Sequence, residues 1–309
     1  MRYDVTIIGG GVAGLSAALV LSRVGRRVVV VDAGQPRNAP ADHLHGFLSR
    51  DGMSPLELLR AGRDEVAGYG GELVEDLVEV VERGSGAEFE VRLAGGRALT
   101  TRAVVVATGL HDELPDVAGV RELWGSDVLH CPYCHGHEVR DKAIGVLGGD
   151  NRPFTLHQTS LVRLWSPDVV FFPHRITLTD EEHERFAARG IRVVEGEVSR
   201  VVEKDGRVSG VELADGRLEP RTAVFVGPRF FPRDELLKGL GCDVEDGWVV
   251  VDGVGRTSVP GVFAAGNVVS ESAQLANAVG AGSSAGIAVN HHLLAAETAQ
   301  AVAAYRAAR

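Results

Sequence analysis

The amino-acid sequence predicts an α/β protein with two parallel-sheet units, and three features carry this prediction. An apolar run at residues 3–8 ends in glycines and leads into a helical pattern. A second apolar run at 28–31 follows, and the succession of apolar run and glycine turn returns at 143–149. Strands that alternate with helices are typical of parallel sheets covered by helices. We therefore expect two Rossmann-like, three-layer ββα units.

The first glycine turn has the spacing G-x-G-x-x-G at Gly9, Gly11 and Gly14. In such a turn, the first glycine permits the bend, the second lets the backbone approach a pyrophosphate, and the third lets helix and strand pack closely. The pyrophosphate lies at the amino terminus of the helix. Asp32, at the end of the second strand, is placed to bond ribose hydroxyls. The turn therefore predicts an adenine-dinucleotide site.

A β-rich stretch at 73–106 follows, and its glycine turns predict a hairpin insertion that ends in a buried strand and the turn Ala107-Thr108-Gly109.

Near the carboxyl end, a strand and turn at 261–267 lead into a helix expected over 274–294. Its glycines at 280, 282 and 286 predict close helix packing. The chain thus returns to its first unit. We expect a discontinuous first domain formed by residues 1–114 and 245–309, and a central domain formed by residues 115–244.

Composition excludes several classes of function. The 309 residues include 42 acidic and 32 basic ones, for a formal net charge of −10, which disfavours binding to nucleic acid or anionic lipid. No apolar run reaches the length of a membrane span, and no export signal is recognised at the amino terminus. With only three cysteines, the sequence indicates a cytoplasmic protein.

Cys131 and Cys134 form a C-x-x-C motif within a segment that also contains His130, His135 and His137. In a reducing compartment such a pair is catalytic or metal-binding rather than a structural staple. Four interpretations are open: a redox-active dithiol, a zinc site made by both cysteines with His135 and His137, a c-type haem attachment site, and a glutaredoxin-like motif. The redox pair is favoured, and no metal is expected. The remaining Cys242 is expected to be structural.

Together, the first glycine turn, Ala107-Thr108-Gly109, the C-x-x-C between two nucleotide-type units, and residues 257–267 resemble the low-molecular-weight thioredoxin reductases over nearly the whole chain. The resemblance implies FAD in the first domain, redox cysteines in the central domain, and a homodimer. It also implies the cofactor contacts Gly9, Gly11, Val12, Ala13, Gly14, Asp32, Gln35, Arg37, Asn38, His45, Ala107, Thr108, Gly109, Gly266, Asn267, Gln274 and Leu275. The family more often has Asp at the position of Asn267.

The same resemblance implies roles for the catalytic residues. Cys134 would face the flavin and Cys131 would exchange with substrate. These reductases usually have Asp directly after the second cysteine, whereas this chain has His135. An imidazole with a near-neutral pKa is a suitable base for a thiol. His137 and His130 are further candidates for this base.

The second glycine turn departs from a working NADPH site. Asp150 stands where the backbone should approach a pyrophosphate, and Pro153 stands where a small residue is usual. After the next strand, only His174 and Arg175 could meet a 2′-phosphate. We therefore expect nicotinamide binding to be lost.

Without NADPH, electrons could pass from a substrate dithiol to the cysteine pair, to FAD and to O2, with release of H2O2. Residues 131–138 are similar to those of dithiol oxidases that close disulfides in small natural products of the holomycin and gliotoxin type. In this mechanism a substrate thiolate attacks Cys131, and His135 or His137 deprotonates the second thiol. The alternatives are a thioredoxin-disulfide reductase that uses NADPH or ferredoxin, and a non-catalytic flavin sensor or zinc-stabilised scaffold.

Overall fold

The computed structural model describes residues 1–84 and 86–309, and the chain forms two compact units. The first unit contains residues 1–37, 56–111 and 232–309, and the second contains residues 38–55 and 112–231. These units differ from the predicted domains in three segments, one of which is residues 112–114, in the second unit. Residues 38–55 belong with the second unit, and residues 232–244 belong with the first.

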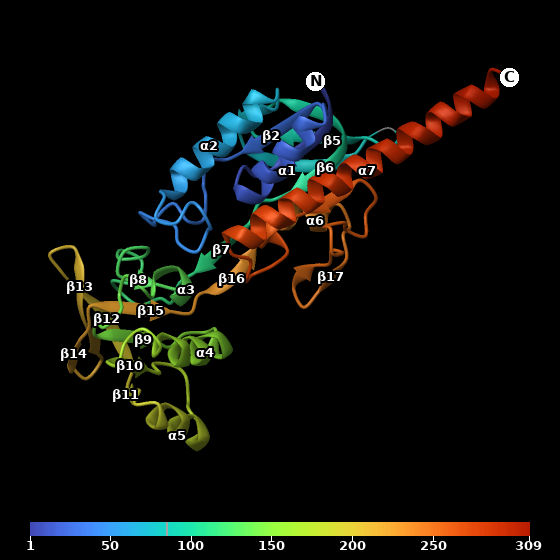
Figure 1. The fold of residues 1–309 in the computed structure, drawn as a ribbon. Coiled ribbons are helices and arrows are strands. Elements are labelled where there is room, and N and C mark those ends of the chain that lie inside the picture. The colour runs from blue at the N-terminus through green and yellow to red at the C-terminus, as the bar shows by residue number, and fades with distance from the viewer. Residues whose placement is uncertain (85) are drawn as a thin grey trace. The chain divides into compact units, whose positions relative to one another are not determined.

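The first unit is built on a sheet of seven strands (Figure 1). Its strands are β1 (Arg2–Ile8), β2 (Val28–Asp32), β3 (Glu72–Glu75), β4 (Val78–Arg83), β5 (Phe89–Leu93), β6 (Ala98–Val106) and β19 (Val262–Ala264). The order is β3-β2-β1-β6-β5-β4, with β19 paired to β6. β1, β2, β3, β6 and β19 pair in parallel, whereas β4, β5 and β6 form the predicted antiparallel insertion.

Helices cover one face of this sheet. The remaining elements of the unit are α1 (Val12–Arg23), α2 (Pro55–Gly68), α6 (Glu235–Gly239), the short 3-10 helix η1 (Gly266–Val268), α7 (Leu275–Ala307), β17 (Val244–Glu245) and β18 (Trp248–Val249). Val5 and Val30 of the sheet pack with Leu15 and Leu21 of α1 and with Val289 of α7. Because α1 follows directly from β1, this packing fixes the glycine turn between them.

Helix α7 is longer than the sequence predicts, since it continues beyond residue 294 to Ala307. The added segment is rich in alanine, which has the highest helix propensity. Glu297 also holds this segment, because it forms ion pairs with Arg26 and Arg102 that lower the pKa of its carboxyl to about 2. Within the described part of the chain, no helix is long and apolar enough to cross a membrane.

Two glycines of α7 differ in how tightly they pack. A Cβ on Gly282 would overlap the carbonyl oxygen of Ala13 in α1, whereas a Cβ on Gly280 would meet nothing within 4 Å. The predicted close packing is thus confirmed for Gly282 and for Gly286, which meets Ala17, and it is wrong for Gly280, which faces open space.

This difference predicts opposite effects of alanine at two positions of one helix. Gly282→Ala is expected to lower the free energy of unfolding by about 1–3 kcal/mol, because α1 must move away. Gly280→Ala is expected to raise it by about 0.5–1 kcal/mol, because alanine loses less backbone entropy on folding. Urea unfolding of both variants measures the difference, and equal effects at the two positions would contradict the packing described here.

The second unit has a parallel sheet of five strands in the order β11-β10-β9-β15-β8 and an antiparallel sheet in the order β12-β13-β14. Its strands are β8 (Val128–Leu129), β9 (Ile144–Leu147), β10 (Val169–Phe172), β11 (Arg192–Val193), β12 (Val198–Lys204), β13 (Arg207–Leu213), β14 (Leu218–Pro220) and β15 (Ala223–Val226). β7 (Leu110–Glu113) and β16 (Arg229–Pro232) pair with each other where the chain passes between the units.

The second unit has three layers, formed by helices, the parallel sheet and the antiparallel sheet. Its helices are α3 (Pro132–His135), α4 (Arg152–Val162) and α5 (Asp180–Ala188). On one face of the parallel sheet, Val146 and Phe171 pack with Val162 of α4 and Phe186 of α5. The opposite face packs against the antiparallel sheet through residues such as Val211. Both units therefore have the predicted α/β architecture with parallel-sheet cores.

Candidate active site

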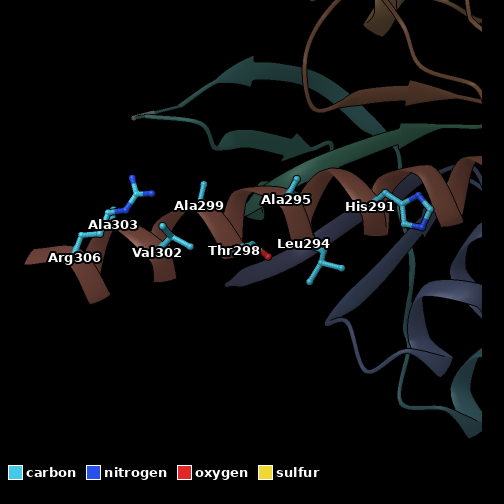
Figure 2. A pocket seen from close by; sticks show the side chains of 8 residues that line it. All are labelled: His291, Leu294, Ala295, Thr298, Ala299, Val302, Ala303 and Arg306. Carbon is cyan, nitrogen blue, oxygen red and sulfur yellow. The ribbon is translucent and has the colours of Figure 1, made fainter. Parts of the chain in front are cut away.

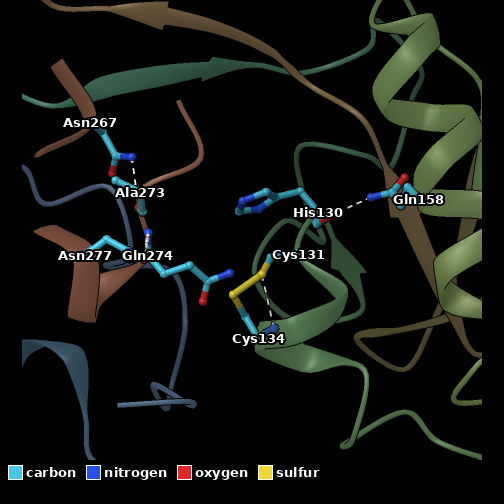
Figure 3. Close-up of a disulfide and its surroundings, with 8 residues drawn as sticks. All are labelled: His130, Cys131, Cys134, Gln158, Asn267, Ala273, Gln274 and Asn277. Carbon is cyan, nitrogen blue, oxygen red and sulfur yellow. Dashed lines mark hydrogen bonds between the residues drawn. A yellow bond between two sulfur atoms is a disulfide. The ribbon is translucent and has the colours of Figure 1, made fainter. Parts of the chain in front are cut away.

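Cys131 and Cys134 form a disulfide in the second unit (Figure 3), with their Cα atoms 5.2 Å apart. Cys131 precedes the single turn of α3, and Cys134 lies within it. The backbone N–H of Cys134 donates a hydrogen bond to Sγ of Cys131 at 3.1 Å. An N–H donor at a sulfur stabilises its thiolate, so this contact favours Cys131 as the leaving thiolate when a mixed disulfide on Cys131 is resolved.

Gln158 of α4 fixes the chain just before the disulfide. Its side chain is buried, and Nε2 donates to the carbonyl oxygen of His130 at 2.6 Å (Figure 3). Nε2 also donates to the carbonyl oxygen of Val226 at 3.1 Å. The ring of His130 stacks on Trp124 at 5.5 Å and meets the edge of Phe230 at 6.4 Å. These ring contacts hold the imidazole of His130 in place beside the disulfide-bonded Cys131.

Gly136 lets the turn after the cysteines pack against Trp165. A Cβ at this position would lie 2.6 Å from both the indole Cδ2 of Trp165 and the carbonyl oxygen of Pro132. The indole also meets Tyr133 edge to face at 6.0 Å. Trp165 thus holds α3 and the histidine that follows Cys134 in one position.

His135 is the histidine suited to act as a base. It is partly buried, and this burial lowers the pKa of its imidazole from the ordinary value, against an opposing contribution from the Glu138 carboxylate. His45 lowers this pKa further. A neutral imidazole at physiological pH can accept a proton from a thiol.

His137 is in a different situation, because it is exposed and lies against Arg140. Nη1 of Arg140 is 2.8 Å from Nε2 of His137 and 3.3 Å from Nδ1. A guanidinium can only donate, so the imidazole nitrogen it contacts is occupied as an acceptor. Of the two predicted bases, the geometry favours His135.

The zinc interpretation requires both sulfurs as free thiolate ligands. Both sulfurs are joined to each other, and across residues 1–84 and 86–309 no cluster of three or more histidine, cysteine or acidic side chains is arranged to hold a metal ion. The third cysteine, Cys242, is a buried free thiol packed in the hydrophobic core of the first unit.

The first glycine turn has the geometry of a dinucleotide site. Gly9 has a φ of +102°, and a Cβ there would overlap the carbonyl oxygen of Ala107. A Cβ on Gly14 would overlap Gly9 itself. At Gly11, by contrast, a Cβ would meet nothing within 4 Å, and no side chain caps the amino terminus of α1 that begins there. The open, uncapped helix end fits the pyrophosphate of a dinucleotide.

Asp32 lies beside this turn. Its Oδ1 accepts from the backbone N–H of Gly10 at 3.1 Å, and its Oδ2 accepts from Nη2 of Arg63 at 2.5 Å. A carboxylate has about four acceptor sites, so Asp32 can still bind ribose hydroxyls. Arg63, on α2, is a neighbour that the sequence analysis did not identify.

The turn at Gly266 and Asn267, near the carboxyl end of the chain, lies beside the start of α1. A Cβ on Gly266 would lie 2.9 Å from Cβ of Ala13 at the start of α1. Nδ2 of Asn267 donates to the carbonyl oxygens of Ser270 and Ala273, so its Oδ1 is the atom suited to accept from a ribityl hydroxyl (Figure 3). Gln274 caps α7 and Leu275 begins it.

The other predicted cofactor residues are distributed over both units. In the first unit, Val12 begins α1, and Gln35 and Arg37 follow β2. The hydroxyl of Thr108 donates to the carbonyl oxygen of Arg233 at 2.6 Å, and Gly109 has a φ of +71°. Asn38 and His45, in contrast, belong to the second unit. The residues around Gly11 and Asp32 are thus brought together and fit FAD. The ring of His45 lies 3.4 Å from Oδ2 of Asp51 and 3.5 Å from Oε1 of Glu138.

Comparison with known proteins identifies the family to which the chain belongs. A family model described as pyridine nucleotide-disulphide oxidoreductase matches residues 3–151 and 168–282. The chain belongs to this family.

Individual relatives agree with this family. Thioredoxin reductase sirT of Leptosphaeria maculans is 31% identical, with 96% of each chain covered, and thioredoxin reductase tcpT of Claviceps purpurea is 30% identical, with 94% of each covered. The solved structure of HlmI is 53% identical and superposes with a TM-score of 0.96, covering 100% of this chain and 98% of the other. The predicted resemblance and fold class are confirmed, and the chain is a disulfide oxidoreductase of the thioredoxin-reductase type.

The second glycine turn of this disulfide oxidoreductase does not fit a pyrophosphate. Asp150 is an exposed carboxylate at the position that corresponds to Gly11, and the side chain of Asn151 donates to the carbonyl oxygen of Pro228 at 3.0 Å. Arg152, at the start of α4, is paired with the carboxylate of Glu182 at 2.7 and 2.8 Å. The turn therefore presents net negative charge where an anion would have to bind.

The expected 2′-phosphate ligands are also poorly placed. Nδ1 of His174 accepts from the backbone N–H of Val198 at 2.9 Å, and Arg175 is a single exposed guanidinium next to it. Of these residues, Arg175 alone offers an unpaired position for a 2′-phosphate at this strand end, because Arg152 is bound to Glu182 and Nδ1 of His174 is bound to Val198.

Proposed function

We propose that the protein is an FAD-dependent dithiol oxidase, which forms an intramolecular disulfide in a small dithiol and reduces O2 to H2O2. The observation that carries the proposal is the contrast between the two glycine turns. Gly11 leaves an open helix end for one dinucleotide, whereas Asp150 and the Arg152–Glu182 pair oppose a second one. One dinucleotide site and one redox disulfide are what an oxidase of this kind requires.

Bound FAD would supply a two-electron acceptor that O2 can reoxidise to give H2O2. The chain's own residues perform the thiol exchange. A substrate thiolate attacks Sγ of Cys131, a substrate–Cys131 bond forms, and Cys134 leaves as a thiolate. In the reductase family the second cysteine faces the flavin, so Cys134 is the sulfur from which the electron pair departs.

His135 acts in the second half of the exchange. It takes the proton of the second substrate thiol, whose sulfur attacks the substrate sulfur bound to Cys131. The product disulfide forms, and Cys131 leaves as a thiolate stabilised by the N–H of Cys134. The substrate has then lost two electrons and two protons, and the cysteine pair has gained the electrons.

The surroundings of Cys131 indicate the class of substrate. His130, which precedes Cys131, belongs to a continuous chain of ring contacts with Trp124, Phe230 and Phe154. Aromatic rings favour a small organic molecule such as a natural-product dithiol. The buried free thiol of Cys242 is typical of a reducing compartment, so we place the reaction in the cytoplasm.

The second candidate function is that of a thioredoxin-disulfide reductase using NADPH or ferredoxin. The relatives named thioredoxin reductase favour it. The direction of electron flow separates the two functions. In a reductase the flavin delivers electrons to the cysteine pair, whereas in an oxidase the cysteine pair delivers electrons to the flavin.

Oxygen and thiol stoichiometry test the proposal. With dithiothreitol as the dithiol, the oxidase is expected to consume one O2 and release one H2O2 for each disulfide formed. Added catalase should halve the net consumption of O2, since it returns half of the oxygen. Turnover that requires NADPH and thioredoxin, with no uptake of O2 on addition of dithiol, would favour the reductase instead.

We also propose that the protein is a homodimer and that the outer part of α7 contributes to the contact. This part of the helix exposes a hollow lined by apolar side chains, which include Leu294, Ala299 and Val302 (Figure 2). Leu294 is 52% exposed and Val302 is 42% exposed.

Substitution of Leu294 tests the dimer. Light scattering is expected to give twice the chain mass of 32.8 kDa for the unaltered protein and the single-chain mass for Leu294→Glu. Leu218→Glu, at an equally exposed leucine of the second unit, should leave the dimer intact. An unaltered protein with the mass of one chain would refute the dimer, and a dimeric Leu294→Glu would move the contact elsewhere.

A further inference from the structure

The segment that carries the disulfide leaves the parallel sheet of the second unit from a very short edge strand. This strand, β8, has two residues, Val128 and Leu129, which pair with Val224 and Phe225 of β15. Cys131 lies only two residues beyond it. Strands in globular proteins are usually longer, and two paired residues give little support to the chain that follows. The position of Cys131 therefore depends on contacts outside the sheet.

Gln158 of α4 supplies such a contact at the end of β8. The pairing of β15 with β8 stops at Phe225 and Leu129, so the next residues along the two strands are Val226 and His130. Nε2 of Gln158 carries two hydrogens and donates to the carbonyl oxygens of both, at 3.1 and 2.6 Å. The side chain is 1% exposed, so water does not compete for these bonds. Gln158 thus joins the two strands at the point where they separate.

The stability of α4 does not explain a glutamine at this position. Among the residues that the structure describes, Oε1 of Gln158 is buried and has no hydrogen-bond partner. A buried carbonyl without a partner is less favourable than an apolar group of the same shape. The adjacent Thr159 is also buried, but its hydroxyl donates within the helix, to the carbonyl oxygen of Thr155 at 2.8 Å. What distinguishes Gln158 is its bond to the chain that leads into Cys131.

A second support lies after the cysteines, where Gly136 packs against the indole of Trp165. Between the two supports, Cys131 has an extended backbone, with φ −102° and ψ 106°, and its Sγ accepts from the N–H of Cys134 at 3.1 Å. The chain is held on both sides of the pair. The sulfur of Cys131 therefore has little freedom to move away from Cys134 once the bond between them is broken.

The freedom of the reduced pair determines how readily its disulfide re-forms. Closure is intramolecular, so its equilibrium depends on the effective concentration of one thiol at the other. A support that limits the movement of the dithiol raises this concentration and favours the disulfide. The pair then has a lower reduction potential and gives up its electrons more readily.

We propose that Gln158 is a positioning residue of the redox pair, which holds Cys131 beside Cys134 in the dithiol form and so lowers the reduction potential of the pair. When the Sγ–Sγ bond re-forms, two electrons and two protons leave the cysteines, and Gln158 transfers neither. The inference rests on the proposed function only in taking the flavin as the acceptor of these electrons. Helix α4, which begins at the second glycine turn, serves the disulfide in this account.

The test is the equilibrium of the flavin-containing protein with mixtures of reduced and oxidised dithiothreitol in the absence of O2, read by acid quenching, alkylation and mass measurement. Each dithiothreitol that closes its ring gives two electrons and two protons to the pair. Gln158→Met has a similar shape but no donor. It is expected to shift the equilibrium roughly ten-fold toward the dithiol, which corresponds to about 30 mV, with unchanged flavin content.

Thr159→Val is the matched control, because it removes a hydrogen bond from the adjacent buried position of the same helix. Its equilibrium should stay within two-fold of that of the unaltered protein. Gln158→Asn keeps an amide that is one methylene too short to reach both carbonyl oxygens, so we expect a smaller shift in the same direction. This variant decides the question if Gln158→Met does not fold.

Shifts below two-fold in the folded Gln158 variants would overturn the proposal, and so would an equal shift in Thr159→Val. The outcome for the oxidase function is separate. A reduced protein that O2 does not reoxidise would refute that function alone, because the equilibrium with dithiothreitol does not involve O2. A disulfide that dithiothreitol does not reduce at any ratio would refute both.

Discussion

Replacement of Cys131 with serine is expected to abolish oxygen consumption driven by a dithiol, with a loss on the order of 10³-fold or more. Serine cannot form a disulfide with Cys134, so the substrate thiolate has no disulfide bond to attack. Flavin content should be unchanged, because the dinucleotide turn belongs to the other compact unit. Oxygen uptake with dithiothreitol, measured beside the flavin absorbance of the same sample, checks both statements.

Cys242→Ala is the matched control. The Cys242 thiol is buried in the core of the first unit, and burial raises its pKa, so it is a poor thiolate. This variant should lose about 1 kcal/mol of stability and keep its activity. Activity that survives in Cys131→Ser, or that disappears in Cys242→Ala, would contradict the assignment of the redox pair.

Replacement of His135 with glutamine is expected to slow disulfide exchange by about 10²–10⁴-fold near neutral pH. Burial lowers the pKa of His135, so the imidazole is neutral at pH 7 and loses its ability to accept a proton only as the pH falls through that lowered value. The deficit should therefore be largest near neutral pH. It should decrease at acidic pH, where the unaltered base is protonated, and at alkaline pH, where substrate thiols ionise.

His137→Gln separates the two neighbouring histidines. His137 is exposed and its ring contacts Arg140, so its replacement is expected to change the rate less than five-fold, a small effect beside that of a general base. Rates measured with dithiothreitol over the same pH range compare the two variants. A larger loss in His137→Gln than in His135→Gln would reverse the assignment of the base.

Local patterns explain why much of the fold was predictable from the sequence. The first glycine turn, Asp32 at a strand end and the C-x-x-C motif are short-range signals, because each depends on residues close together in the chain. The strand pattern of the β4–β6 insertion was read correctly for the same reason. The end of α7 was missed, since an alanine-rich sequence can continue a helix with few large apolar residues to show the helical period.

Contacts between distant parts of the chain were not predictable. Arg63 reaches Asp32 from α2, and Gln158 reaches the carbonyl oxygen of His130 from α4. No residue pattern links either pair, because the fold alone brings them together. The contact of His45 with Glu138 is of the same kind, since the two residues lie far apart in the sequence.

An anaerobic stopped-flow measurement of the flavin absorbance tests the oxidase account most directly. The protein is mixed in turn with NADPH and with dithiothreitol, and air is then admitted. The account predicts that dithiothreitol bleaches the flavin, that NADPH does not, and that air restores the absorbance with release of H2O2. Bleaching by NADPH within seconds would show that the turn at Asp150 binds the nucleotide, and the protein would then be a reductase.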